Sequence, residues 1–242
     1  MVTGFREGLA IGFSAWVLAA ACPQAATLDP GGMIVMPGST AESNPELAGT
    51  VVNDNLLSTS LSYVPDGQQT LFAYFKVQNR VTRSALDDTM IFGPRILLGA
   101  NVTAGNLLVD RVEISGFGSY AIDASYRTDG LGDRGPTSAT RSADGNVLDF
   151  AFNFPLTISN LFQGTHEESF FLSLKTDARA FENTGRLSIF ARAAGDEFNT
   201  YRFDVGDVAV PIDPPSPVPL PASAVLMLAG LALLARFRTA RT

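Results

Sequence analysis

The side chains that most often carry acid–base catalysis are scarce in this sequence of 242 residues. It contains one His, His166, beside Glu167 and Glu168, and one Cys, Cys22. The Gly-x-Ser-x-Gly motif of a nucleophile elbow is absent, so no activated serine accompanies the histidine. His166 is therefore interpreted as a solvated loop residue, and a zinc site of the Cys/His type is excluded.

Pairs of carboxylates are a second possible source of chemistry, because two acids facing each other across a cleft can hydrolyse a glycosidic bond. Three adjacent pairs occur, at Asp87-Asp88, Glu167-Glu168 and Asp196-Glu197. All stand at the ends of predicted strands, where solvated loop charge is the ordinary explanation. The sequence thus predicts a protein that is not an enzyme.

Calcium is the metal that the composition favours, because exported β proteins often tie their loops with oxygen ligands. Asp129 and Asp133 flank Gly130-Leu131-Gly132, a loop able to bend two carboxylates toward one ion. The spacing departs from that of an EF-hand loop, and a flexible hairpin loop explains the same residues. A calcium site at Asp129 and Asp133 remains an option, and no other cofactor is predicted.

Tyrosine side chains could contact a carbohydrate, since each presents an apolar ring face and a polar tip. Tyr63, Tyr120 and Tyr126 are the candidates, although core packing explains them equally well. Nucleic acid is excluded as a ligand, because the formal net charge is −7 and basic residues cluster only at the C-terminus.

The elements that must position these residues are strands. From Gln69 to Val81, apolar residues occupy every second position, at Leu71, Ala73, Phe75 and Val77. The positions between them hold a second, more polar set, namely Phe72, Tyr74, Lys76 and Gln78. Similar runs lie at 89–98, 107–115, 120–127, 147–154, 169–176, 186–192 and 199–205, with weaker ones at 33–36, 50–53 and 56–64. Turn residues such as Asp66-Gly67 and Asp144-Gly145 separate them.

This pattern predicts an all-β domain over residues 27–210. Many short strands without intervening helices favour an antiparallel β-sandwich with jelly-roll or Ig-like connections. We expect the aromatic residues of the strands to interdigitate between the sheets, namely Phe72, Tyr74, Phe75, Phe150, Phe152, Phe154, Phe170, Phe171, Phe190, Phe198, Tyr201 and Phe203.

Residues 1–26 have the form of a secretory signal peptide. Arg6 precedes an apolar run from Leu9 to Ala21, which is too short to cross a bilayer core of ~30 Å. Cleavage is expected near Ala26, with Ala21 as the alternative. Cys22 offers a second interpretation, lipidation, although the preceding Leu stands one position farther away than in a lipoprotein signal.

The C-terminal segment has three parts with distinct physical properties. Residues 211–217 form a Pro-rich spacer, which should be extended and stiff. An apolar stretch from Ala224 to Ala235 follows, and counting from Val218 gives the minimum length for a transmembrane helix. Arg236, Arg238 and Arg241 then provide a basic end that should stay cytoplasmic.

Residues 218–242 resemble the VPLPA variant of the PEP-CTERM sorting signal of Gram-negative bacteria. The motif itself is Val218, Pro219, Leu220, Pro221 and Ala222, and Leu220 stands where Glu is usual in the family. The resemblance implies that an exosortase in the inner membrane recognises this motif and cleaves near it. It also implies that Arg236, Arg238 and Arg241 act as a stop-transfer signal.

The leading hypothesis is therefore an exported structural or interaction protein. Its precursor would be held transiently in the inner membrane, and the processed chain would reach the cell surface or an exopolysaccharide matrix of the kind found in biofilms. The alternative is a carbohydrate-binding module that recognises the matrix polysaccharide directly.

Overall fold

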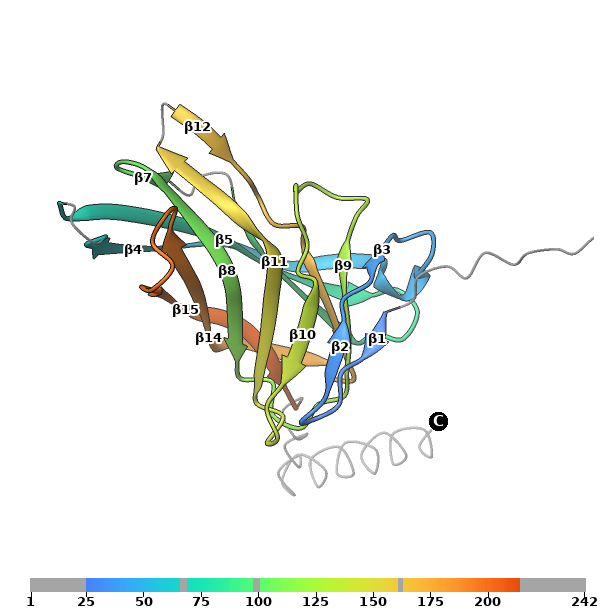
Figure 1. Cartoon of the computed structure of the whole chain (residues 1–242). Coiled ribbons are helices and arrows are strands. Elements are labelled where there is room, and N and C mark those ends of the chain that lie inside the picture. The colour runs from blue at the N-terminus through green and yellow to red at the C-terminus, as the bar shows by residue number, and fades with distance from the viewer. Residues whose placement is uncertain (1–24, 66–68, 98–100, 161–162, 214–242) are drawn as a thin grey trace, which may run out of the picture.

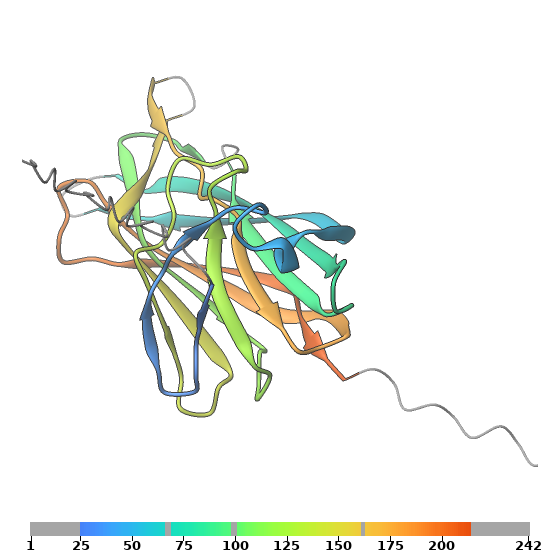
Figure 2. The ribbon, with the colours of Figure 1, turned by 90° about the vertical axis from the view of Figure 1, so that its right-hand side faces the viewer.

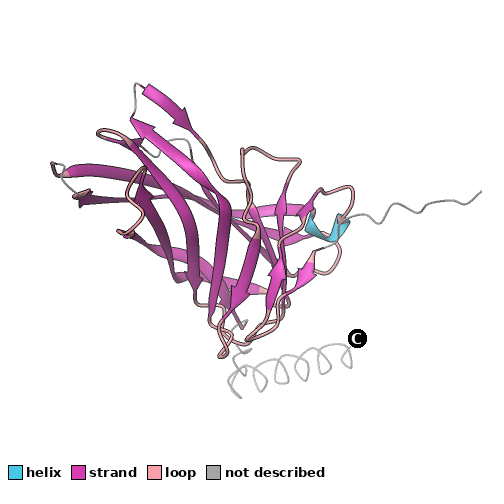
Figure 3. Ribbon diagram, in the orientation of Figure 1, coloured by secondary structure: helices cyan, strands magenta, loops and turns pink. Residues whose placement is uncertain are grey.

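The computed structural model describes residues 25–65, 69–97, 101–160 and 163–213 (Figure 1). The predicted signal-peptide run, Cys22, the motif at 218–222 and the terminal arginines lie outside these residues. The described chain is all-β, as predicted, with one short 3-10 helix, η1 (Pro45–Leu47), and no α-helix (Figure 3). No helix among the described residues has the length and hydropathy needed to cross a membrane.

Fifteen strands occur in the described ranges. They are β1 (Ala26–Thr27), β2 (Met33–Val35), β3 (Gly38–Ser39), β4 (Gly49–Tyr63), β5 (Leu71–Ser84), β6 (Met90–Ile96), β7 (Asn101–Val102), β8 (Asn106–Ser115), β9 (Ile122–Arg127), β10 (Ser138–Arg141), β11 (Val147–Asn160), β12 (Gln163–His166), β13 (Leu172–Thr176), β14 (Ala180–Ala193) and β15 (Tyr201–Ile212).

The strands form two mainly antiparallel sheets. The first has the order β4-β5-β6-β13-β9, and β1 and β3 both pair with β9. The second has the order β15-β14-β8-β11, and β10 and β12 both pair with β11. The short β7 pairs with β5 and with β11 and so links the two sheets. In Figures 1 and 2, β4 and β5 run across the direction of β8 and β11.

The core lies between the two sheets and follows the predicted alternation along β5. Ala73, Phe75 and Val77 are fully buried. The Phe75 ring packs against Phe203 of β15, with ring centroids 4.6 Å apart, so the inner faces of the two sheets meet at this point. This contact joins residues that are distant in the sequence, and burial of such large apolar side chains is the main favourable term in folding.

Several strands are longer than the sequence indicated, among them β4, β11, β14 and β15. The weak candidates at 50–53 and 56–64 form a single strand, β4, whose polar centre at Asn53-Asp54-Asn55 interrupts the apolar pattern. β15 continues through Pro211 and Ile212, the first two residues of the predicted spacer. Proline is tolerated there because β15 pairs only with β14 among the described strands, so its other edge needs no N–H donor.

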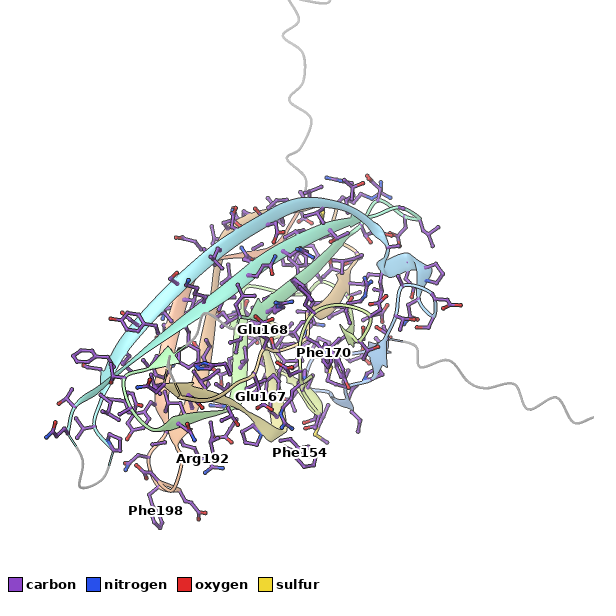
Figure 4. The ribbon with its side chains drawn as sticks, turned by 90° about the horizontal axis from the view of Figure 1, so that it is seen from above. Phe154, Glu167, Glu168, Phe170, Arg192 and Phe198 are labelled. Carbon is purple, nitrogen blue, oxygen red and sulfur yellow. The ribbon has the colours of Figure 1, made fainter. Side chains whose placement is uncertain are left out.

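Several aromatic residues expected in the core are exposed instead. Phe72 and Tyr74 are each 49% exposed on the outward face of β5, while Phe154 and Phe198 are 69% and 93% exposed. Phe198 lies in the loop before β15, and Phe154 lies where the register of β11 against β8 shifts. Figure 4 shows both of these rings at the rim of the molecule. Alternation predicts two faces for a strand but not whether the second face is covered.

Candidate functional site

A pocket of about 530 Å³ lies on the outward face of β5, over β6 and the residues that lead into β13. We call it the outer pocket and define it by Gln78, Arg80, Thr82, Arg127 and Phe171. Its volume falls within the range of small-molecule sites, and its walls combine apolar surface with a few polar groups, as such sites usually do.

The polar centre of the outer pocket is Arg80. Its Nη2 donates to Asp54 Oδ2 at 2.8 Å, and Gln78 Nε2 donates to Asp54 Oδ1 at 2.8 Å. Burial alone would raise the pKa of Asp54, but the hydrogen bonds from Arg80 and Gln78 outweigh burial and lower it. The two donors on β5 are thus held in place by one carboxylate of the edge strand β4.

One buried donor of Arg80 has no partner. Its Nε is buried and has no hydrogen-bond partner, while the guanidinium carbon lies 4.4 Å from the centre of the Phe171 ring. A buried donor without a partner costs about 1–3 kcal/mol. The Arg80 side chain is 33% exposed, so a ligand can reach the guanidinium through its exposed N–H groups. The outer pocket therefore contains a fixed donor beside an aromatic ring.

The second charged residue of the outer pocket is Arg127, at the end of β9. Its Nε and Nη2 donate to Asp129 Oδ1 and Oδ2 at 2.7 and 2.9 Å, and Asp129 Oδ2 also accepts from the Ala41 N–H at 2.8 Å. The hydrogen bond from Arg127 is the main cause that lowers the pKa of Asp129. Arg127 and Asp129 together fasten the N-terminal segment beside the pocket.

These contacts bear on the predicted calcium site. The Asp129 carboxylate is engaged by Arg127, and Asp133 Oδ2 accepts from the backbone N–H of Glu168 at 2.8 Å. Within the described ranges, no group of three or more His, Cys, Asp or Glu side chains is placed to hold a metal ion. Asp129 and Asp133 therefore have separate partners in the structure. A calcium site formed by these two residues stays a prediction.

His166, Glu167 and Glu168, weighed in the sequence as acid–base candidates and interpreted as solvated loop residues, are held in ion pairs and strand contacts. His166 is the last residue of β12 rather than a loop residue, and its Nε2 lies 2.9 Å from the Asn160 carbonyl oxygen. Glu167 accepts from Arg134 at 2.7 Å, and Glu168 pairs with the buried Arg95. Figure 4 shows Glu167 and Glu168 near the middle of the molecule. These contacts serve the packing of β12 and β6.

The three tyrosines that were candidates for carbohydrate contact, or equally for core packing, have partners within the protein. Tyr63 is buried against Tyr201, with ring centroids 4.8 Å apart. Tyr126 stacks on Phe170 at 5.7 Å, and the Tyr120 hydroxyl donates to Asp213. Burial, followed by the neighbouring Tyr201, raises the pKa of Tyr63 to about 12, so this hydroxyl stays neutral.

The exposed aromatics on the outward face of β5 were missed by sequence reasoning. Phe72 and Tyr74 share this face with Gln78 and Arg80, because alternate residues of a strand point the same way. Their neighbours on the edge strand β4 are Ser62 and Ser60, whose small side chains leave the rings uncovered. The signal was present in the sequence, since the polar residues Lys76 and Gln78 belong to the same alternating set.

Comparison of the chain with protein-family models, curated proteins and solved structures finds no match. The features of the chain that bear on function are the C-terminal sequence pattern and the outward face of the first sheet.

Proposed function

We propose that this chain is an exported structural or interaction protein of a Gram-negative bacterium, sorted by an exosortase to the cell surface or to an exopolysaccharide matrix. The observation that carries the proposal is the order of its C-terminal parts. The motif at Val218–Ala222 precedes an apolar stretch and then Arg236, Arg238 and Arg241. An apolar segment followed by arginines is retained with the basic end in the cytoplasm.

The domain that precedes this segment suits an exported chain. We propose that it is a β-sandwich with jelly-roll or Ig-like connections, supported by the two antiparallel sheets and by the contact between Phe75 and Phe203. Because Cys22 is the only cysteine of the sequence, the domain has no internal disulfide. A domain of this size can bury enough surface to be stable without one.

Mass spectrometry of the protein from its native host tests the sorting proposal. No Lys or Arg lies between Arg202 and Arg236, so trypsin releases one peptide, residues 203–236, that contains the whole motif. We expect this peptide to be missing from the surface fraction and to reappear in a strain whose exosortase is deleted. Recovery of the intact peptide from most surface molecules of the parent strain would contradict cleavage.

Carbohydrate binding is the second candidate function, and the exposed pair Phe72 and Tyr74 favours it. Phe72 and Tyr74 are each 49% exposed on the same face of β5, and exposed aromatic rings that stand together can form a contact surface for a ligand. A pull-down on the exopolysaccharide of the same host tests this function. We expect the exopolysaccharide to retain the wild-type protein. If it retains no more of this protein than of an unrelated exported protein, carbohydrate binding is contradicted.

A further inference from the structure

We infer that the outer pocket and the adjoining outward face of β5 form one elongated binding site for a chain of uncharged sugar units. This inference rests on the second proposed function, carbohydrate binding, and names the site and the class of ligand. It is independent of how the C-terminal segment is processed.

The polar groups of the outer pocket match a sugar hydroxyl, which both donates and accepts hydrogen bonds. Arg80 is 33% exposed and uses one N–H of Nη2 for Asp54, which leaves exposed guanidinium N–H groups to donate. Gln78 donates its amide N–H to Asp54, which leaves the amide oxygen as an acceptor. The Thr82 and Ser173 side chains also line the pocket and can act in either role. A ligand with several neighbouring hydroxyls would satisfy all of these groups.

The charge balance of the pocket favours an uncharged ligand over an anion. Its two charged residues are Arg80 and Arg127, and each is paired with an aspartate within hydrogen-bonding distance. An anionic ligand would have to approach Asp54 and Asp129 or displace them from these pairs. A neutral hydroxyl can bond to an arginine while the ion pair stays in place.

The aromatic rings extend the site beyond the pocket. Residues 72, 74, 76, 78, 80 and 82 share the outward face of β5, and a strand rises ~3.3 Å per residue, so Phe72 and Arg80 stand ~26 Å apart along it. This span is longer than one sugar ring. On β4, Ser58, Ser60 and Ser62 stand opposite Lys76, Tyr74 and Phe72 and add a parallel row of hydroxyls. An extended chain lying along β5 would contact rings, hydroxyls and pocket together.

Isothermal titration calorimetry on the full-length chain tests the inference, in a zwitterionic detergent that has no sugar headgroup. The probes are oligosaccharides of glucose, mannose and galactose with one to six units, together with hexagalacturonate as the charged counterpart. We expect at least one neutral series to bind, with an affinity that rises with chain length. Failure of all neutral series, or binding of hexagalacturonate alone, would overturn the inference.

Three variants locate the site. Arg80→Gln should lower the affinity about ten-fold or more at every chain length, because it removes a charged hydrogen-bond donor. Gln78→Leu tests the same pocket if Arg80→Gln does not fold, as judged by circular dichroism. Tyr74→Ser should weaken only the longer oligosaccharides, since Tyr74 lies outside the pocket.

Arg202→Gln is the matched control, because Arg202 also pairs with an aspartate, Asp204, and lies over a ring, Phe190, but takes no part in the outer pocket. It should bind like the wild type. Equal loss in Arg80→Gln and Arg202→Gln would overturn the site. If the protein binds no sugar but its C-terminal segment is still processed, the sugar site is wrong. The sorting proposal then stands, because it does not depend on the pocket.

Discussion

Arg141 shows how one charged residue can organise backbone at the end of a β domain. Its side chain is buried, and its three guanidinium nitrogens donate to four backbone carbonyls, those of Leu28, Gly118, Tyr120 and Gly145, at 2.7 to 2.9 Å. Burial lowers the pKa of Arg141, and the charges of Asp29 and Asp177 oppose this effect. The fork of the guanidinium therefore joins three loop segments, those around Leu28, Gly118–Tyr120 and Gly145.

Replacement of Arg141 by lysine should lower the free energy of unfolding by about 2–4 kcal/mol. A single ammonium group cannot reach four carbonyls arranged for a planar fork, so some of them lose their partner while remaining buried. Urea denaturation measures the change. Arg202→Lys, at a half-exposed ion pair, is the control and should stay within about 0.5 kcal/mol of the wild type. A shift no larger than that of the control would refute the role assigned to Arg141.

Tyr63 should make the domain sensitive to alkaline pH. Its pKa is raised to about 12 by burial and by Tyr201, whereas an unfolded tyrosine ionises at a pKa of ~10. The stability that this neutral hydroxyl contributes is complete below pH ~10 and is lost as pH rises toward 12, because only the unfolded chain gives up the proton readily.

The comparison of wild type with Tyr63→Phe isolates this effect. Thermal unfolding followed by circular dichroism from pH 8 to 12 should show a steeper loss of Tm for the wild type than for the variant above pH ~10. Parallel curves over the whole range would show that Tyr63 does not titrate as expected.

At the scale of elements, β5 connects the core, the second sheet and the outer pocket. Its inward residues pack in the core, and its outward residues carry Arg80 and the exposed rings. The buried Asn79 extends its connections, because its Nδ2 donates to the Asp207 carbonyl and its Oδ1 accepts from the Ala209 N–H. Asp207 has a positive φ of 59°, so Asn79 meets β15 at a local irregularity.

Asn79→Leu should destabilise the domain by about 1–3 kcal/mol, since it leaves the Asp207 carbonyl and the Ala209 N–H without their partner inside the protein. Asn55→Leu is the control, because Asn55 stands directly opposite Asn79 in the register but is exposed on the edge strand. Chemical denaturation of both variants checks the difference. Similar losses in the two would mean that the link between β5 and β15 carries little energy.

The positions of most strands could be predicted from the sequence, because the alternation of apolar residues is a local property. Which strands pair with one another could not be predicted in this way. The run 71–77 predicted its inner face correctly, and β4 was seen only as two weak fragments because its polar centre lies on an edge strand that needs no apolar pattern. The short strand β7 depends on a partner far away in the chain, whereas β10 and β12 each form a hairpin with the neighbouring strand β11. Two to four residues carry too little pattern to be recognised alone.

At the scale of the whole molecule, the candidate site could be predicted only in fragments. Asp129 was singled out as a possible calcium ligand, yet its position is explained by Arg127, two residues away, and by the Ala41 N–H. Arg80 and Phe171 share no local pattern and meet only because β5, β6 and β13 are neighbours in one sheet. The proposed C-terminal signal is different in kind, since it is argued from the order of its residues and not from the fold.

The terminal arginines provide the last prediction. The apolar stretch that precedes them is barely long enough to span a membrane, so retention of the precursor should depend strongly on Arg236, Arg238 and Arg241. Each charge drawn into the bilayer centre costs ~2.5–3.5 kcal/mol on insertion scales, and three together make translocation of the basic end rare. Replacement of all three by serine removes this barrier.

The triple variant should therefore pass fully into the periplasm and keep its motif uncleaved. The β domain should fold normally, because the last described strand, β15, ends at Ile212, well before the substituted positions. Fractionation of cells, detection of the 203–236 segment by mass spectrometry and circular dichroism of the soluble protein measure the three parts of this expectation. If the variant is retained in the membrane and processed as the parent is, the arginines are not what holds the precursor there, and the apolar stretch alone must be sufficient.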